Sequence, residues 1–264
     1  MKNNNQKFLI KLDIFLLILF PIASVVLSLL LKANFLLTTL LFFGLPSIWL
    51  SFRTKHMVAK TALFSFIWAI PLTFFADYIA TISGAWFVPH TVFPFRLFGI
   101  IPIEDFIWLF LASYSVLIFY EHFLDKGKHE LINKRMKYLI WPWIIFALVF
   151  TTILFAKPEL LKISYSYFYL GLFFIFLPAV SFLSIFPRLL SKYVKTASYF
   201  FVLALLFELT GLHLNNWIFY DNGYFIGWVE LFGYRFPFEE FFFWFVIGAI
   251  SVLSYYEFFD DDRK

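Results

Sequence analysis

Six acidic side chains lie within or beside long apolar stretches of the chain, where ionisable groups are rare and usually functional. They are Asp77, Glu104, Asp105, Glu208, Glu239 and Glu240. Because we expect no Lys or Arg in the centres of these stretches, we expect the carboxyls to be at least partly protonated. A protonated carboxyl in an apolar pocket can donate a proton to a substrate, so the pattern indicates general acid chemistry.

The acids recur with the same neighbours. The first set contains Asp77, Trp86 and Pro102-Ile103-Glu104-Asp105, and the second contains Glu208, Trp217 and Pro237-Phe238-Glu239-Glu240. Nine residues separate the isolated acid from the tryptophan in both sets, and the two prolines are 135 residues apart. Tyr120 and Tyr255 continue the match at the same offset. The sequence therefore predicts an internal repeat.

Helix geometry offers a structural explanation for part of this pattern. Proline favours the first position of a helix, and acids in the first turn complement the helix dipole, which suits Glu104, Asp105, Glu239 and Glu240. Glu208 is different, because it follows Lys195 by 13 residues, or about 20 Å of helix. That depth indicates a functional carboxyl or one that is hydrogen-bonded to a neighbouring helix.

Aromatic side chains accompany the acids. Trp108 follows Glu104 by four residues and Trp244 follows Glu240 by four, so each tryptophan shares a helix face with an acid. Aromatic faces stabilise cations. We expect a substrate-binding set of Phe106, Trp108, Trp217, Tyr220, Phe241, Phe243 and Trp244. We interpret Trp86 as an anchor at the membrane interface.

The composition excludes a soluble globular protein. Of 264 residues, 62% are hydrophobic and only 14% are charged, which is too few charges to cover a water-facing surface. The absence of Cys excludes disulfides, thiolate metal sites and cysteine nucleophiles. The five His show no paired ligand spacing, so we expect no metal. No nucleotide-binding motif occurs, so we expect no cofactor, and the net charge of +4 does not indicate nucleic-acid binding.

The fold class predicted is an all-α polytopic membrane protein with about eight transmembrane helices. The expected spans are Phe8–Leu31, Phe35–Ser51, Thr61–Ile82, Pro102–Phe123, Tyr138–Ala156, Ile163–Phe186, Lys195–Leu214 and Phe236–Phe258.

Basic residues orient these spans. Sixteen Lys and Arg fall on the side that holds both termini and five on the other, which predicts cytoplasmic termini in the cell membrane. We expect a first repeat at 1–125, a basic linker at 126–137 and a second repeat at 138–264. Four spans per repeat give both repeats the same topology, with a site where they meet.

The duplicated Pro-x-acid-acid motif resembles the lycopene cyclase domain family, the small non-flavin membrane type, in its fused two-copy form. The resemblance covers Asp77–Tyr120 and Glu208–Glu257. It depends on Pro102-Ile103-Glu104-Asp105, Pro237-Phe238-Glu239-Glu240-Phe241-Phe242 and Asn216-Trp217-Ile218-Phe219-Tyr220. Asp105 stands where the family usually has a second Glu, so the carboxyl is retained.

This resemblance implies a lycopene β-cyclase, an isomerase of carotenoid biosynthesis that takes lycopene from the bilayer and forms β-ionone rings. An acid protonates the terminal double bond, an alkene attacks the carbocation, and a base removes a proton. We expect acid and base roles for Glu104, Asp105, Glu239 and Glu240, with Glu208 and Asp77 supplying protons or tuning the others. The donor, the acceptor, the ring type, the substrate length and the oligomeric state stay open.

Other functions remain alternatives. A related carotenoid enzyme would form a different ring, act on a longer carotenoid or add water. A proton-coupled transporter also uses membrane acids and repeats, but it needs a polar path across the bilayer. A membrane prenyltransferase would need Asp-rich motifs that bind Mg²⁺. A purely structural protein would tolerate the change of Glu239 and Glu240 to Gln.

Overall fold

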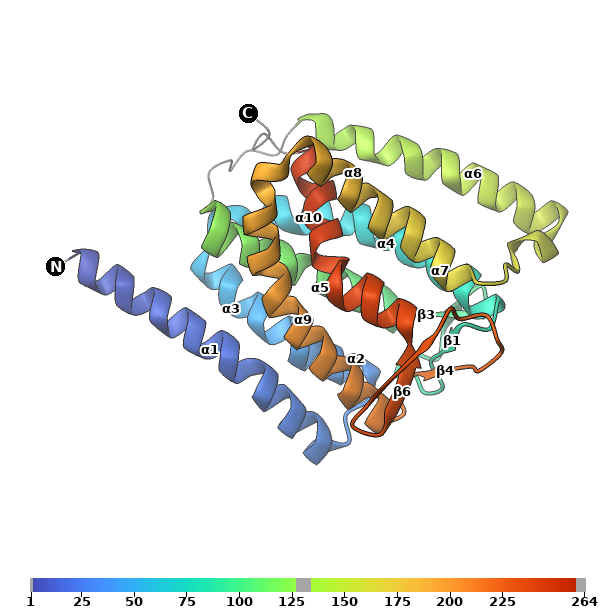
Figure 1. Cartoon of the computed structure of the whole chain (residues 1–264), viewed down its shortest axis with the longest axis horizontal. Coiled ribbons are helices and arrows are strands. Elements are labelled where there is room, and N and C mark those ends of the chain that lie inside the picture. The colour runs from blue at the N-terminus through green and yellow to red at the C-terminus, as the bar shows by residue number, and fades with distance from the viewer. Residues whose placement is uncertain (1, 127–133, 260–264) are drawn as a thin grey trace.

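The computed structural model describes residues 2–126 and 134–259. These residues form a helical bundle with short strands gathered at one end (Figure 1). We call residues 2–126 the N-terminal half and residues 134–259 the C-terminal half. Most of the basic linker expected at 126–137 lies outside the described residues, and so do Arg263 and Lys264 at the end of the chain.

The N-terminal half contains five α-helices and three strands. They are α1 (Lys2–Leu31), α2 (Phe35–Thr39), α3 (Leu45–Arg53), α4 (Val58–Ile82), β1 (Trp86–Phe87), β2 (Arg96–Leu97), β3 (Ile101–Pro102) and α5 (Ile103–Tyr120). Two π-helical segments, Leu40–Gly44 and Glu121–Asp125, and a 3₁₀ turn at Lys55–Met57 join or extend the helices.

The C-terminal half also has five α-helices and three strands among the described residues. They are α6 (Ile140–Ala156), α7 (Ser166–Gly171), α8 (Leu177–Ile185), α9 (Leu190–His213), β4 (Ile218–Phe219), β5 (Trp228–Leu231), β6 (Tyr234–Pro237) and α10 (Gly248–Phe259). Its π-helical segments are Leu172–Phe176 and Glu240–Val246, and its 3₁₀ turns are Lys134–Leu139, Pro158–Leu161 and Pro187–Leu189.

The two halves therefore run through matching elements in the same order. A short helix, a π-helical segment and a second short helix precede the long helix α4 in one half and the long helix α9 in the other. A strand and a β-hairpin then follow in each half. Strand β1 pairs antiparallel with β4, with Phe87 opposite Ile218, so corresponding positions meet at the join between the halves.

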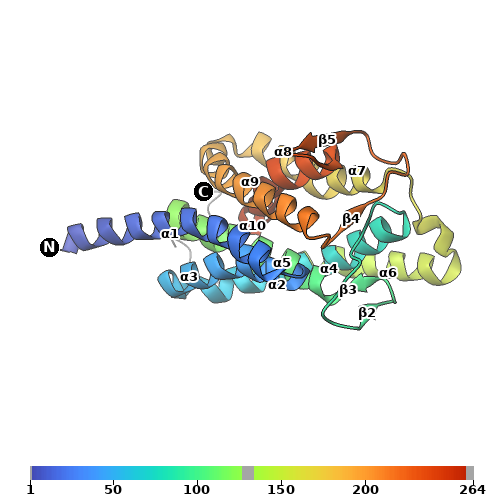
Figure 2. The same cartoon turned by 90° about the horizontal axis from the view of Figure 1, so that it is seen from below.

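The outer helices α1 and α6 lie along opposite flanks of the bundle (Figure 1), and each packs against a helix of the other half. Helix α1 packs against α9, and α6 packs against α4. From below, the two halves form two layers, with α6 on the layer of the N-terminal half (Figure 2). This exchange of outer helices ties the halves together.

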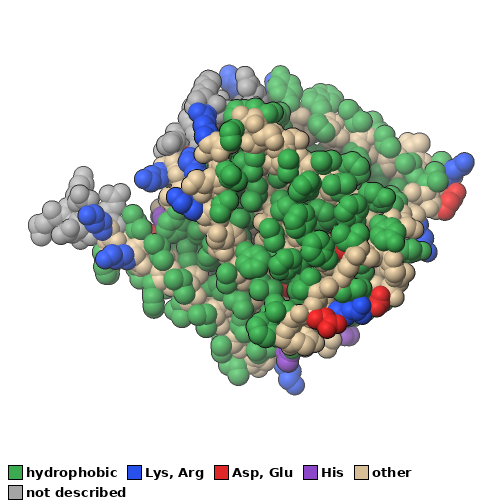
Figure 3. Space-filling model, in the orientation of Figure 1, with side chains coloured by type: hydrophobic (Ala, Val, Ile, Leu, Met, Phe, Trp, Pro, Cys, Tyr) green, Lys and Arg blue, Asp and Glu red, His purple; other side chains and the backbone are tan. Residues whose placement is uncertain are grey.

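The described helices are long and apolar enough to cross a membrane at seven places. An eighth span is possible if Glu240–Val246 and Gly248–Phe259, bent by 49° to each other, count as one. These helices overlap all eight expected ranges, so a helical membrane protein is confirmed at this coarser level. Hydrophobic side chains cover the middle of the surface, and Lys and Arg lie toward its edges (Figure 3).

Prolines explain two of the π-helical segments. Pro46 and Pro178 each stand at the second residue of a helix that continues a π-helical segment. Proline has no N–H and its ring clashes with the carbonyl four residues earlier, and an extra residue in the turn relieves this. Each half thus has a π-helical turn directly before this proline, within Phe35–Arg53 in the N-terminal half and within Ser166–Ile185 in the C-terminal half.

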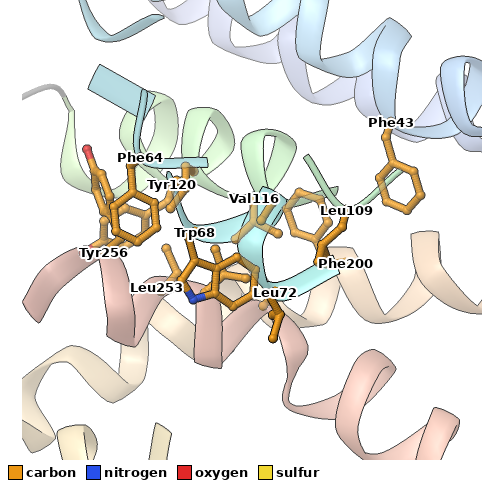
Figure 4. Packing of buried hydrophobic residues seen from close by; sticks show 14 of the residues in the cluster. Phe43, Phe64, Trp68, Leu72, Leu109, Val116, Tyr120, Phe200, Leu253 and Tyr256 are labelled. Carbon is orange, nitrogen blue, oxygen red and sulfur yellow. The ribbon is translucent and has the colours of Figure 1, made fainter. Parts of the chain in front are cut away.

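The core lies between α4, α5, α9 and α10. Trp68 of α4 is fully buried and packs beside Leu72 and Leu253, while Phe64 contacts Tyr256 edge-on with ring centroids 5.2 Å apart (Figure 4). Aromatic contacts of this kind add about 0.5–1.5 kcal/mol beyond the area that they bury.

A reciprocal pair of hydrogen bonds joins α5 to α10. The hydroxyl of Tyr120 donates to Glu257 over 2.5 Å, and the hydroxyl of Tyr256 donates to Glu121. These bonds give Tyr120 and Tyr256 matching contacts, whereas the constant sequence offset pairs Tyr120 with Tyr255. The π-helical segment Glu240–Val246 precedes Tyr256, and a π-helical turn holds about one residue more than an α-helical turn.

One charged group contradicts the expectation that basic side chains stay outside the buried parts of the spans. Lys60 is only 1% exposed within α4, with its Nζ 3.8 Å from Glu121. Arg53 is the last residue of α3 and is 27% exposed, and its Nε lies 2.9 Å from Asp13, which is fully buried in α1.

Gly211 lets the ring of Trp217 lie directly against α9. A Cβ atom at this position would stand 2.0 Å from the ring, far inside van der Waals contact. Gly171 makes the same close approach to Phe243. Only glycine permits these two packings.

We expect Gly211→Ala to lower the free energy of unfolding by about 1–3 kcal/mol, because the new methyl group overpacks against Trp217. Thermal unfolding of the purified protein in detergent measures this. Gly44→Ala is the matched control, since a Cβ there meets Leu40 at an ordinary 3.7 Å. Equal melting temperatures for the two variants would contradict the packing.

We expect Tyr120→Phe to lower the free energy of unfolding by about 1–3 kcal/mol, because it removes a hydrogen-bond donor from the buried carboxyl of Glu257. The control is Tyr220→Phe, at a tyrosine that is 42% exposed. If Tyr120→Phe and Tyr220→Phe both have the melting temperature of the unaltered protein, the reciprocal bonds do not stabilise the joint between the halves.

Candidate functional site

A cavity at the joint of the two halves gathers three of the six predicted acids. The walls of this central cavity include Asp105 of α5, Glu208 of α9 and Glu240 after β6. Its volume is about 90 Å³, below the roughly 300–1,000 Å³ of small-molecule sites, so the side chains around it must move apart to admit a ligand. Most of the other lining side chains are apolar or aromatic, so the carboxyls face a dry interior.

Asp105 pairs with Asp77. Both side chains are buried, and their carboxyls lie close enough to interact electrostatically. Two neighbouring carboxyls in an apolar space favour holding one proton between them, because two negative charges would repel each other there. Asp77 lies on a smaller adjoining space, the connecting hollow, whose walls also include Trp86, Tyr167, Phe174 and Trp244.

Glu240 receives a hydrogen bond from the hydroxyl of Tyr167. Tyr167 lies in α7 and is buried. Since a tyrosine hydroxyl donates to the carboxyl here, the arrangement suits Glu240 as a proton acceptor. Sequence analysis missed Tyr167, because it stands outside the repeated acid motifs.

Glu208 receives a hydrogen bond from the indole Nε1 of Trp217 over 3.0 Å. The nine-residue spacing brings these two together, since α9 ends at His213 and the chain turns back at Asn215, which has a positive φ of 55°. Gly211 allows the close approach. Trp217 therefore positions the carboxyl as well as lining the cavity.

Glu104 and Glu239 hold loops instead of lining the central cavity. One carboxyl oxygen of Glu104 accepts the backbone N–H groups of Val92 at 2.5 Å and Phe93 at 3.1 Å. In the same way, Glu239 accepts the N–H of Ile226 at 2.7 Å. The second oxygen of each carboxyl is buried without a partner among the described residues.

The two acids of each motif thus divide their contacts in the same manner. Asp105 and Glu240, the second acids, face the central cavity. Glu104 and Glu239, the first acids, fasten the loop that precedes their own helix. Consecutive residues at a helix start point in different directions, which explains the division.

Three of the seven predicted aromatic residues line the central cavity: Trp108, Trp217 and Trp244. The rings of Trp108 and Trp244 are 5.5 Å apart, and Trp86 lies 6.1 Å from Trp108. Trp86 is therefore a cavity residue and not the interface anchor that we expected. Its strand β1 pairs with β4, a long-range contact that spacing alone cannot show.

The other four predicted aromatic residues lie elsewhere. Phe106 packs in a separate cluster with Phe75 and Ile101. Phe241 contacts Phe201 and Phe245, and Phe243 covers Gly171. Tyr220 is 42% exposed. None of the four lines the central cavity.

Within the described residues, no three His, Cys, Asp or Glu side chains are placed to hold a metal ion together. The arrangement that remains is a set of carboxyls with proton-sharing partners and indole rings in one apolar space. Such a set can transfer protons to and from an uncharged substrate and stabilise a cation formed in between.

In comparisons with known proteins, no protein-family model, no curated protein and no solved structure matches the chain.

Proposed function

We propose that the chain is a lycopene β-cyclase, which converts the acyclic ends of lycopene to β-ionone rings without a change of oxidation state. The observation that carries the proposal is the gathering of Asp105, Glu208 and Glu240 in one apolar cavity walled by tryptophans. Acids in a dry, aromatic space meet the needs of an alkene protonation and a carbocation intermediate.

The proton donor in this proposal is Asp105. Asp77 lies beside it, and two neighbouring carboxyls in an apolar space favour holding one proton between them. Transfer of that proton to the terminal double bond of lycopene leaves a tertiary carbocation. The neighbouring alkene attacks it and the new carbon–carbon bond closes a six-membered ring.

The proton acceptor is Glu240. It takes a proton from the ring carbon next to the relocated cation, which forms the ring double bond and restores a neutral product. Tyr167 orients Glu240, and Glu208 lies in the same cavity to return the proton toward the donor pair. One proton enters the substrate and one leaves, so the reaction is an isomerisation.

The indoles of Trp108 and Trp244 stabilise the cation in between. They stand in contact within the cavity, and an aromatic face attracts a cation by about 0.5–2 kcal/mol. The closely packed walls also exclude water, which would convert the cation to an alcohol. These two side chains have to part when a substrate enters.

The finer view of the fold belongs to the same proposal. We place eight spans in two repeats of the same topology, with both termini in the cytoplasm and the acids toward the opposite face. The matching order of elements in the two halves and the distribution of basic residues in the sequence support this arrangement.

We expect the chain to form cyclised products in cells that accumulate lycopene, and Asp105→Asn and Glu240→Gln to lower their yield by about 100-fold or more, as expected for lost general acid or base catalysis. Pigment extraction and chromatography measure this. Glu230→Gln is the control, at a glutamate whose side chain is 78% exposed. Unchanged lycopene beside a normal level of membrane protein would refute the proposal.

Glu104 and Glu239 are positioning residues in this scheme. We expect Glu239→Gln to keep activity within about tenfold, because its amide oxygen can still accept the N–H of Ile226, whereas Glu239→Ala loses that bond and with it about 1–3 kcal/mol. The same comparison applies to Glu104. Pigment yield per membrane-bound protein separates the roles, since a catalytic carboxyl would be inactivated equally by Gln and Ala.

A further inference from the structure

A second, larger space lies between α6, α8 and α10. This distal hollow has walls that include Trp143 of α6, Phe174, Ser181 of α8 and Tyr255 of α10, and its volume is about 430 Å³. None of the described residues that line it is charged. No step of the cyclisation described above uses it.

The hollow exists because α6 packs to one side. Helix α6 packs against α4, and Trp143 stacks on Phe174 with ring centroids 6.3 Å apart. Phe146, one turn along the same face of α6, contacts Phe174 at 5.8 Å and Phe75 of α4 at 4.6 Å. Phe150 is the only buried side chain of α6, so this helix leaves α8 uncovered on its inner side.

The N-terminal half fills the same place with a charged cluster. Ser181 and Ile185 of α8 correspond to Trp49 and Arg53 of α3 at an offset of 132 residues. Both Trp49 and Arg53 donate to the buried Asp13 of α1, over 3.0 and 2.9 Å. This cluster clamps α1 onto α3. The C-terminal half has small or apolar residues there instead, and so it has no corresponding clamp.

The distal hollow adjoins the site through Phe174. This residue lines both the distal and the connecting hollow, and the connecting hollow shares Trp86, Ile175 and Trp244 with the central cavity. Because Pro178 has no N–H, it cannot donate the usual helical hydrogen bond to the carbonyl of Phe174. That carbonyl accepts a hydrogen bond from the Tyr255 hydroxyl over 3.1 Å instead. Phe174 and Tyr255 thus form the boundary between a space with carboxyls and a space without charge.

The two spaces lie along one bent helical unit. Glu240 lines the central cavity and Phe258 the distal hollow. The 18 residues from one to the other run through Glu240–Val246 and Gly248–Phe259, which are bent by 49° to each other, so the direct distance is shorter than the about 27 Å of a straight α-helix of this length. A phospholipid would bring a charged headgroup that the described walls do not match, whereas an uncharged hydrocarbon chain matches them along their whole length.

We propose that the distal hollow is a second subsite, which admits the substrate between α6 and α8 and holds the far end of the acyclic polyene while the near end lies at Asp105 and Glu240. This inference rests on the proposed function for the identity of the chain. It makes the distal hollow the part of the site that selects substrates by length.

The first test fills the hollow. Ser181→Trp installs the residue that stands at the corresponding position of the N-terminal half. Ser184→Trp is the control on the same helix, at a serine that is exposed like Ser181 but does not line the hollow. We expect Ser181→Trp to lower the conversion of lycopene by about tenfold or more, because the indole occupies the space of the polyene. Ser184→Trp should match the unaltered chain. Equal conversion by both variants, at equal protein levels, would overturn the inference.

The second test measures binding without turnover. Asp105→Asn protein is purified in detergent from cells that accumulate either lycopene or an acyclic C30 carotenoid, and the pigment bound per mole of protein is read from its absorbance. We expect the added Ser181→Trp change to abolish retention of lycopene but not of the shorter chain, and the added Ser184→Trp change to alter neither.

The outcomes separate the two proposals. Loss of both pigments with Ser181→Trp, retention of both, or co-purification of phospholipid alone would overturn the subsite. Length-selective retention by a protein whose unaltered form never cyclises lycopene would support the subsite and refute the proposed function.

Discussion

The constraint behind this structure is the cost of placing a carboxyl where water cannot reach it. A buried polar group without a partner costs several kcal/mol in an apolar medium. Asp77 lies beside Asp105. Glu208 accepts a hydrogen bond from the indole of Trp217, and Glu240 accepts one from the hydroxyl of Tyr167. Glu104 and Glu239 accept hydrogen bonds from backbone amides. Most of the local architecture follows from these pairings: the glycine under Trp217, the strand pair at the joint and the loops fastened to the helix starts.

The two halves solve the same problem with different chemistry. In the N-terminal half one carboxyl lies beside another, and in the C-terminal half both carboxyls receive hydrogen bonds from aromatic donors. The acids of the two halves thus have unlike environments, and unlike environments are what separates an acid from a base in one site.

The apolar spans, the six acids within or beside them and the tryptophans four residues after an acid can be identified from the sequence, because hydropathy and helix periodicity mark them. Tyr167 and the inward position of Trp86 cannot be identified in this way, since both depend on contacts between segments far apart in the chain. The π-helical segment that shifts the matching contact from Tyr255 to Tyr256 leaves no compositional signal. The buried Lys60 borders an apolar run, where charge alone suggests a loop.

The central cavity combines acids of both halves in a single space among the described residues. The two halves therefore do not form two separate cavities of this kind, one for each tip of a symmetrical substrate. In the proposed reaction, a hydrocarbon that is altered at both tips would have to withdraw, reverse its direction and enter again. The product with one modified tip would then be released, and its share of the final pigment would depend on how fast it returns from the surrounding lipid.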